Sequence, residues 1–368
     1  MTRPNVAFFG SSLLSSYWNG AATYYRGIIR ALHARGWSVT FYEPDAYDRQ
    51  SHLDISPPAW ARVVVYDPAR ADDVLALVAD AARDADVLVK ASGIGVHDEV
   101  LEAAMPQLSR PGALCIYWDV DAPATLERMQ DDEHDPLRLA LPGYDLVLTY
   151  GGGRPVVEAY RALGARDCVP VYNGLDPETH HPETPDPRLA AHLAFLANRL
   201  PDREARVDEF FLHPAALLPA HTFLLGGSGW HDRDIPANVR RLGHVRTQDH
   251  NVFNCSATAV LNVNRSSMAR FGHSPATRVF EAAGAGACLI TDAFEGVEAF
   301  LEPDREVLVT ASGDDVAACV ASLTPERARA IGAAARARVL AEHTYEHRAD
   351  LVEQAVGIAS PGRGVRSC

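Results

Sequence analysis

Residues 273–292 read HSPATRVFEAAGAGACLITD, and this stretch decides which fold the chain is expected to adopt. Ser274 suits the capping position of a helix and Pro275 suits its first turn, so the pattern predicts a helix over 275–285. The apolar run ACLITD that follows predicts a strand, and ATAVLNVN (257–264) predicts another strand before the helix. Strand, helix and strand in this order predict two parallel strands joined by a right-handed crossover.

The same alternation continues outward in both directions. Apolar runs that are nearly continuous and separated by helical stretches are typical of a parallel sheet covered on both faces. In the N-terminal half we expect strands at 5–10, 38–45, 62–67, 86–93, 113–121, 144–152 and 168–174, with helices at 21–36, 72–83 and 154–163. In the C-terminal half we expect strands at 192–198, 221–227, 240–245, 257–264, 287–292 and 306–310, with helices at 203–212, 249–254, 275–285, 314–322 and 325–356.

These elements predict an α/β protein with two Rossmann-like doubly wound domains that face a cleft, where ligands bind at the carboxyl ends of the strands. A length of 368 residues also favours two domains. The expected parts are an N-terminal domain (1–174), a proline-rich linker (175–190), a C-terminal domain (191–345), a C-terminal helix expected to pack back on the first domain (346–358) and a disordered tail (359–368).

The composition excludes several classes of protein. A net charge of −14 argues against a protein that coats nucleic acid or an anionic membrane. No stretch approaches the roughly 20 apolar residues of a membrane span, and the N-terminal apolar run is too short for a signal peptide, so we expect a soluble cytoplasmic protein. The six cysteines form no C-x-x-C pair, and therefore neither a zinc site nor a disulfide framework is predicted.

The start of the 275–285 helix has the chemistry of an anion site. Free backbone N–H groups and the helix dipole favour a negative charge there, and Thr277 and Arg278 add a hydroxyl and a cation beside Ser274. Glu281, one turn further on, is able to accept two hydrogen bonds from a ribose diol. The alternative is a capped helix whose Arg278 and Glu281 form a surface pair worth only ~0.3 kcal/mol.

Several longer stretches occur in a recognisable order. VYNGLDPETHHP (171–182) contains Asn-Gly-x-Asp followed by His-Pro, and HSPATRVFEAAGAGACLITDAFEGVEAFLEPDREVLV (273–309) ends in Pro-x-x-Glu-Val-Leu. They are accompanied by IYWDVDAP (116–123), YDLVLTYGGGRPVVEAYRALGAR (144–166), LANRLPDREARVDEFF (196–211) and LLGGSGW (224–230). This set covers nearly the whole chain and resembles the GT-B glycosyltransferases, and more closely the CgeB-like (spore maturation protein) group of predicted glycosyltransferases.

The resemblance implies that the second domain binds a nucleotide-diphosphate sugar. Many retaining GT-B enzymes carry two Glu residues separated by seven others, of which the second holds the ribose and the first contacts the donor sugar. Glu281 matches the second position, whereas His273 stands at the first. His273 could therefore contact the sugar or a phosphate, or it could serve only in the loop that caps the helix.

Basic side chains and helix N-termini neutralise the leaving phosphate in GT-B sites, which usually lack a metal held by Asp-x-Asp. Arg199 and Arg203 follow a strand end, where a loop could aim them at the diphosphate. A solvated helix residue is the alternative for Arg203. Asn264 and Arg265 end another strand at the same cleft and are further candidates.

Two glycine-containing segments complete the expected ligand contacts. Gly243 and Val245 stand where GT-B proteins place the base against backbone groups. In the first domain the loop after residue 9 lacks the fingerprint of a dinucleotide site or a P-loop. Gly10 and Ser11 nevertheless allow a ligand to approach the backbone closely.

The segment YWDVD (117–121) supplies candidate catalytic acids. In this architecture it is a strand end that faces the cleft rather than a metal-binding Asp-x-Asp motif. Asp119 or Asp121 could deprotonate an acceptor hydroxyl if the enzyme inverts the anomeric configuration. The alternative is a carboxylate that caps the next turn.

The sequence thus predicts a metal-independent glycosyltransferase that moves a sugar from a nucleotide-diphosphate donor to an acceptor hydroxyl in the cleft. A UDP-sugar is the expected donor, acting as a co-substrate, and no cofactor is expected. The acceptor (a glycan, a small molecule or a protein), the stereochemical outcome and the oligomeric state stay open, and no nucleic-acid partner is expected. The alternatives are a non-catalytic protein that binds a nucleotide-sugar or glycan on the same scaffold, and a sugar-nucleotide epimerase.

Overall fold

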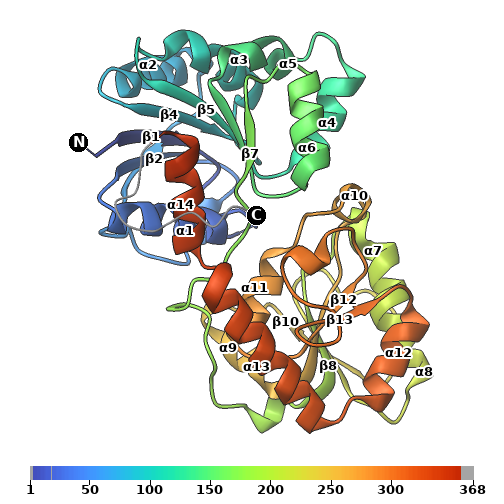
Figure 1. Ribbon diagram of the computed structural model, residues 1–368. Helices are drawn as coiled ribbons and strands as arrows, with labels where there is room; N and C mark the ends of the chain where they lie inside the picture. The colour runs from blue at the N-terminus through green and yellow to red at the C-terminus, as the bar shows by residue number, and fades with distance from the viewer. Residues whose placement is uncertain (1–2, 18, 358–368) are drawn as a thin grey trace. The chain divides into compact units, whose positions relative to one another are not determined.

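The structure is a computed structural model and describes residues 3–17 and 19–357. The chain divides into two compact units (Figure 1). The first consists of Met1–Tyr172 with the C-terminal segment that begins at Tyr345, and the second of Asn173–Thr344. The expected disordered tail, 359–368, lies outside the described residues. Among the residues that are described, no helix is long and apolar enough to cross a lipid bilayer.

The first unit is built on a parallel sheet of seven strands in the order β3-β2-β1-β4-β5-β6-β7. The strands are β1 (Asn5–Phe9), β2 (Ser38–Pro44), β3 (Arg62–Tyr66), β4 (Val87–Ala91), β5 (Leu114–Asp119), β6 (Leu146–Thr149) and β7 (Cys168–Pro170). Strand β1 pairs with both β2 and β4, so the strand order reverses at β1 as in a doubly wound sheet. Phe8 packs against Tyr25 on one face of the sheet, whereas its neighbour Phe9 stacks on Tyr42 on the other.

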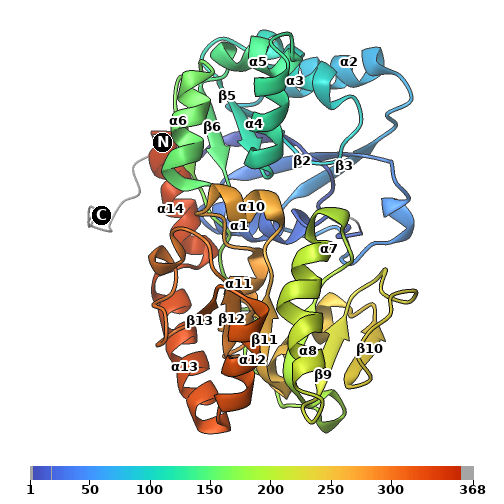
Figure 2. The same ribbon diagram turned by 90° about the vertical axis from the view of Figure 1, so that its right-hand side faces the viewer.

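Helices cover both faces of this sheet (Figures 1 and 2). One face carries α1 (Ala22–Ala34) and α14 (Tyr345–Ala355), and the other carries α2 (Ala71–Ala82), α3 (Asp98–Leu108) and α5 (Pro136–Ala140). Helices α4 (Ala122–Asp131) and α6 (Gly153–Ala162) pack together beside the last strands. The covered sheet explains why its strands are apolar on both sides.

The second unit repeats the architecture with six parallel strands in the order β10-β9-β8-β11-β12-β13. These are β8 (Ala191–Leu196), β9 (Phe223–Gly226), β10 (Val239–Gly243), β11 (Ala257–Asn262), β12 (Leu289–Asp292) and β13 (Leu308–Thr310). Its helices are α7 (Pro201–Val207), α8 (His213–Leu217), α9 (His250–Ser256), α10 (Ser266–Phe271), α11 (Thr277–Gly284), α12 (Gly313–Ser322) and α13 (Pro325–Glu342). Short helical turns lie at Arg49–Ser51, Leu141–Gly143, Pro187–Leu189, Asp208–Leu212, Thr247–Asp249 and Val297–Ala299.

Two strand orders of this kind confirm the prediction of two Rossmann-like doubly wound domains. Several predicted helices were wrong in detail. The helix expected at 203–212 is α7 followed by a π-helical turn, and α3, α4, α5, α8 and α10 were not predicted. Helices α5, α8 and α10 are too short to show a periodic pattern, and α3 contains Pro106.

The helical stretch expected over 325–356 is two helices, α13 and α14. The chain leaves the helical conformation at His343 and Thr344, because Leu175 N–H donates to the His343 carbonyl at 2.7 Å and Leu175 forms a β-bridge with Thr344. Helix α13 therefore belongs to the second unit, while α14 belongs to the first.

Helix α14 is held against α1 by a close approach at Gly27. A Cβ at Gly27 would lie 2.2 Å from the Tyr345 ring, so only glycine leaves room for this packing. Arg35 also pairs with Asp350 at 2.6 Å and with Glu353 at 2.8 Å. The C-terminal helix is thus an integral part of the core of the first unit.

Candidate functional site

Polar side chains gather where the strands of the second sheet end. Asn264 follows β11, and Asp292 is the last residue of β12. The Asn264 backbone N–H donates to Asp292 Oδ1 at 3.0 Å, which joins the two strand ends. Asp292 is fully buried and pairs with Arg206. Burial raises the pKa of the Asp292 carboxyl, although Arg206 opposes that shift.

Helix α11 starts at this edge (Figure 2), but its cap differs from the prediction. The predicted N-cap, Ser274, is wrong: the N-cap residue is Ala276, and the helix begins at Thr277. Pro275 favours extended backbone at the residue before it, which delays the start of the helix. Ser274 is 2% exposed, and its Oγ has no hydrogen-bond partner among the described residues.

His273 lies in a strained turn before this helix. Its φ of 44° is in the left-handed region, and its N–H donates to the Glu295 carbonyl at 2.6 Å. The ring lies against Gly296, where a Cβ would come within 2.3 Å of the ring carbon Cδ2. The turn therefore fixes the imidazole, whose Nδ1 is buried without a hydrogen-bond partner in the described part of the chain.

Unpartnered buried polar atoms are concentrated at this edge. Buried polar groups in proteins nearly always have a partner, so such a concentration points to a missing water or ligand. Within residues 3–17 and 19–357, the atoms without a hydrogen-bond partner here are His180 Nε2, Arg203 Nε, Arg206 Nε, Asn262 Oδ1, Asn264 Nδ2, Ser267 Oγ, His273 Nδ1 and Ser274 Oγ.

Two guanidinium groups at the same edge lack a carboxylate partner. Arg278 forms no ion pair with any described residue, and its guanidinium lies 5.6 Å from the centre of the Phe195 ring. Burial, and then the charge of Arg203, lowers the pKa of Arg278 to about 10. Burial also lowers the pKa of Arg203, whose Nη2 donates to the Asn198 carbonyl at 3.2 Å. The site thus holds two partly buried positive charges that an anion would stabilise.

The other predicted arginines already have acidic partners. Arg199 pairs with Glu204 at 2.7 Å and with Asp232 at 3.0 Å, and these carboxylates raise its pKa. Arg265 pairs with Asp202 at 2.6 Å. Their charges are therefore largely neutralised within the protein, which distinguishes them from Arg203 and Arg278.

Glu281 lies one turn into α11 beside two histidines that were not predicted. Glu281 Oε1 is 3.7 Å from Nε2 of His180, which is 2% exposed. His250, the first residue of α9, belongs to the same group, and the ligating atoms of all three side chains lie within 4.8 Å of one another. Burial lowers the pKa of His250, although the nearby Glu281 opposes that shift.

The segments proposed to contact a base and a phosphate lie next to this group. The Val245 backbone lies close enough to the His250 ring to oppose the lowering of its pKa. Gly243 adopts a φ of 73°, and no atom lies within 4 Å of the place where its Cβ would be. Thr277 Oγ1 is 3.5 Å from Asn173 Oδ1, and the Asn173 amide donates to the Pro275 carbonyl at 3.3 Å.

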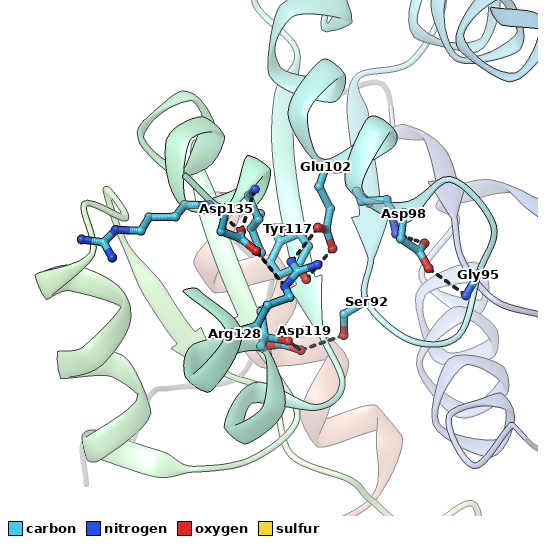
Figure 3. A network of polar contacts seen from close by, with 12 residues as sticks. Ser92, Gly95, Asp98, Glu102, Tyr117, Asp119, Arg128 and Asp135 are labelled. Carbon is cyan, nitrogen blue, oxygen red and sulfur yellow. Dashed lines mark hydrogen bonds and ion pairs between the residues drawn. The ribbon is translucent and has the colours of Figure 1, made fainter. Parts of the chain in front are cut away.

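In the first unit Asp119 occupies a closed polar network (Figure 3). Its carboxylate is fully buried and accepts from Ser92 Oγ at 2.7 Å, from Thr125 Oγ1 at 3.1 Å and from the Tyr160 hydroxyl at 2.5 Å. Burial raises the pKa of this carboxyl, although these hydrogen bonds oppose the shift. Asp119 is enclosed and fully engaged, which argues against its expected role as a catalytic base.

Asp121 is the more accessible of the two acids. It is the N-cap residue of α4, but its side chain makes no capping hydrogen bond, and its N–H donates to Asp119 Oδ1 at 2.9 Å. Ser11 is buried and donates to Asn19 Oδ1 at 3.0 Å, so its hydroxyl is used inside the protein. At Gly10, a Cβ would lie 2.7 Å from the Phe41 ring, which shows that packing already requires this glycine.

The sequence therefore predicted some of the residues that lie at this edge of the second sheet, and others were missed. Arg203, Asn264, His273 and Ser274 were expected at a ligand, and all four carry a buried atom without a hydrogen-bond partner among the described residues. It missed His180, although THHP in the 171–182 segment places two histidines in a row. It also missed His250, Arg206 and Asp292, which only the fold brings to this edge.

Part of the chain is similar to a known protein family. Residues 203–354 match a family described as glycosyl transferase-like. A comparison with curated proteins gives no match. Because the matched segment contains α11 and most of the residues described above, the edge of the second sheet belongs to the glycosyl transferase-like part of the chain.

Solved structures match over nearly the whole chain. HepE from Anabaena, in complex with UDP and glucose, has a TM-score of 0.67 and 14% identity, covering 96% of this chain and 100% of its own. Sucrose-phosphate synthase from Thermosynechococcus elongatus has a TM-score of 0.69 and 15% identity, covering 96% and 98%. An alpha-glucosyltransferase in complex with UDP-glucose and DNA has a TM-score of 0.68 and 12% identity, covering 97% and 99%.

The fold is therefore GT-B, as the sequence predicted. The family match over residues 203–354 supports the expectation of a glycosyltransferase, whereas the solved structures, with their low sequence identity, show the GT-B fold alone.

Proposed function

We propose that the chain transfers a sugar from a nucleotide-diphosphate sugar to an acceptor hydroxyl, and that the second unit binds the donor. One observation carries this proposal: Arg203 and Arg278 are partly buried without a carboxylate partner, beside buried polar atoms that lack hydrogen-bond partners among the described residues. Maintaining two such charges costs folding free energy, which a bound diphosphate would offset through charge-assisted hydrogen bonds.

In this proposal, different parts of the donor bind to different residues. The diphosphate is placed at Arg203, Arg278 and the free N–H groups at the start of α11, where the helix dipole adds to the attraction. The ribose is placed at Glu281, whose carboxylate can accept from both hydroxyls. A UDP-sugar is the donor we favour, since two of the structural neighbours were solved with UDP or UDP-glucose.

The leaving phosphate is neutralised by protein groups in this proposal, so the reaction needs no metal ion. Arg203 and Arg278 lie where negative charge develops as the sugar leaves the diphosphate. The fixed imidazole of His273, with its unpartnered Nδ1, is placed to contact the sugar or the phosphate next to it. Arg199 and Arg265 are not proposed to bind the diphosphate directly, because each already forms an ion pair with an acidic side chain.

The acceptor side of the reaction is assigned to the first unit. Asp121 follows β5 and is proposed as the base that deprotonates the acceptor hydroxyl, with inversion of the anomeric configuration. Asp119 is proposed to position the β5–α4 turn, because its Oδ1 accepts from the Asp121 N–H. Within the glycosyltransferases we place the chain in the CgeB-like group, on the motifs of segments 171–182 and 273–309.

Calorimetric titration with UDP, GDP and TDP, followed by assays of donor hydrolysis with the corresponding sugars, tests the proposal. We expect one nucleotide to bind and its sugar donor to be hydrolysed slowly without an acceptor. If no nucleotide binds and no donor turns over, the proposal is wrong. Binding without turnover across donors and acceptors would instead favour a non-catalytic binding protein, an alternative motivated by His273 at the position where a Glu was expected.

A further inference from the structure

Three side chains from separate segments converge beside the start of α9 and α11. His180 comes from the 173–186 segment, His250 opens α9, and Glu281 lies in α11. Their ligating atoms lie within 4.8 Å of one another, and His180 Nε2 is 3.7 Å from Glu281 Oε1. A tetrahedral zinc ion with bonds of about 2.0–2.1 Å separates its ligand atoms by roughly 3.3 Å, so small side-chain rotations would close the set around one ion.

The second ring nitrogen of His180 is already held, and the ring of His250 lies beside the Val245 backbone. His180 Nδ1 lies 3.0 Å from Thr179 Oγ1, and the Val245 backbone is close enough to the His250 ring to oppose the lowering of its pKa. The Asn251 amide also donates to the Thr179 carbonyl at 3.0 Å, which ties the segment of His180 to α9. Metal-binding histidines almost always have their other nitrogen fixed in this way, since the contact sets the tautomer and the ring orientation.

The remaining nitrogen of His180 lacks a hydrogen bond. The side chain is 2% exposed, and Nε2 is buried without a hydrogen-bond partner among the described residues. At 3.7 Å, Glu281 Oε1 is too far for a hydrogen bond to it. A buried imidazole nitrogen without a hydrogen-bond partner, close to a carboxylate and a second imidazole, is suited to bind a metal ion.

We propose that His180, His250 and Glu281 bind a divalent transition metal of the Zn²⁺ class, with one coordination position left open. Two imidazoles and one carboxylate are a donor set that suits Zn²⁺, Co²⁺ and Ni²⁺, whereas Mg²⁺ and Ca²⁺ prefer oxygen ligands. This ion would not neutralise the diphosphate of the donor. It would instead occupy Glu281, which is the proposed contact of the ribose.

Metal binding would regulate the donor site, a consequence that rests on the function proposed above. Glu281 cannot hold a metal ion and accept both ribose hydroxyls at once. The ion and the nucleotide therefore exclude each other, and zinc inhibits the transfer reaction while magnesium does not.

Equilibrium dialysis with Zn²⁺, on protein without a polyhistidine tag, tests the metal site by itself. We expect one Zn²⁺ per chain and, for Co²⁺, the visible absorption of a tetrahedral site. His180→Ala and His250→Ala should each weaken binding about 100-fold or more, and Thr179→Ala about tenfold. His181→Ala is the matched control: it is the adjacent histidine, 41% exposed, and should leave zinc affinity unchanged.

Circular dichroism checks that each variant is folded, and His250→Gln replaces His250→Ala if the alanine variant is not. Zinc binding that is equal in wild type, His180→Ala and His250→Gln overturns the metal site. A loss in His181→Ala as large as in His180→Ala overturns it as well, because the ion would then be held elsewhere.

Titration of UDP into protein loaded with stoichiometric Zn²⁺ tests the regulation. Loading at this ratio leaves little free zinc to bind the diphosphate. We expect zinc to weaken UDP binding at least about tenfold in wild type and not in His180→Ala. If zinc and UDP bind together, the exclusion and the ribose role of Glu281 are wrong while the metal site stands. If zinc binds and no nucleotide does, only the proposed function fails; if UDP binds and zinc does not, only the metal site fails.

Discussion

Arg203 lies close enough to Arg278 to lower its pKa, and neither guanidinium has an ion-pair partner among the described residues. Burial of both groups adds to their mutual repulsion, so the protein keeps a positive site at a cost in folding free energy. Other arginines of the second unit avoid that cost, as the pairs Arg199–Glu204 and Arg265–Asp202 show. This exception is the reason why we propose that the diphosphate of the donor binds here.

Replacing Arg278 with Met should stabilise the protein without ligand and abolish donor binding. The folded-state pKa of about 10 lies below the usual value of an arginine in an unfolded chain, so charging this side chain disfavours folding at every pH below about 10. Removing the charge should raise the free energy of unfolding at neutral pH on the order of 1 kcal/mol, and Met keeps an apolar contact with Phe195. Thermal denaturation and UDP calorimetry measure the two effects.

The matched control for that variant is Arg240→Met, which changes an exposed arginine of β10. It should alter neither the melting temperature nor UDP affinity. An Arg278→Met protein that melts below wild type and still binds UDP normally would show that Arg278 has a structural role instead.

Glu281→Gln should separate ribose recognition from phosphate recognition. Loss of a charged acceptor costs about 1–3 kcal/mol, so UDP affinity should fall, whereas pyrophosphate, which has no ribose, should bind as in wild type. Arg278→Met should weaken both ligands. Calorimetry in the presence of a chelator makes the comparison, and equal losses of UDP and pyrophosphate in Glu281→Gln would contradict the ribose assignment.

Substitutions of Asp121 and Asp119 should have different effects, the first on catalysis and the second on stability. Asp121→Asn should lower kcat about 100-fold or more and leave UDP affinity unchanged, since a general base acts only in the chemical step. Asp119→Ala removes the common acceptor of Ser92, Thr125 and Tyr160, and should lower the free energy of unfolding by about 2–4 kcal/mol. Steady-state kinetics and denaturant unfolding measure these effects; an Asp121→Asn enzyme with full kcat would exclude Asp121 as the base.

Gly27→Ala should loosen α14 from the first unit. The added methyl group would meet the Tyr345 ring at 2.2 Å, so we expect a loss of about 1–3 kcal/mol in the free energy of unfolding and faster amide exchange in α14. Gly20→Ala is the matched control, because its Cβ would find no atom within 4 Å. Equal stability of the two variants would show that α14 does not depend on this close approach.

Most of the fold could be predicted from local patterns. The strands of both sheets are apolar runs punctuated by helices, and parallel sheets covered on both faces produce that pattern. The periodic pattern of residues 325–356 does not itself show the break between α13 and α14. The break depends on the pairing of Leu175 with His343 and Thr344. Contacts between segments that are far apart in the chain do not appear in the hydrophobic periodicity of either segment.

The candidate site was predictable where one segment carries its chemistry. Arg278 and Glu281 stand out because both lie on a helix that follows a strand end. The pairing of Arg199 with Glu204, the enclosure of Asp119 and the approach of His180 to Glu281 depend on side-chain contacts, so the sequence could not distinguish neutralised arginines from unpaired ones.

A crystal structure of the protein with UDP tests the central claim most directly. We predict that the diphosphate oxygens lie within hydrogen-bond distance of Arg203 and Arg278, at the start of α11, and that the ribose hydroxyls contact Glu281. UDP bound with its phosphates away from both arginines would contradict the account.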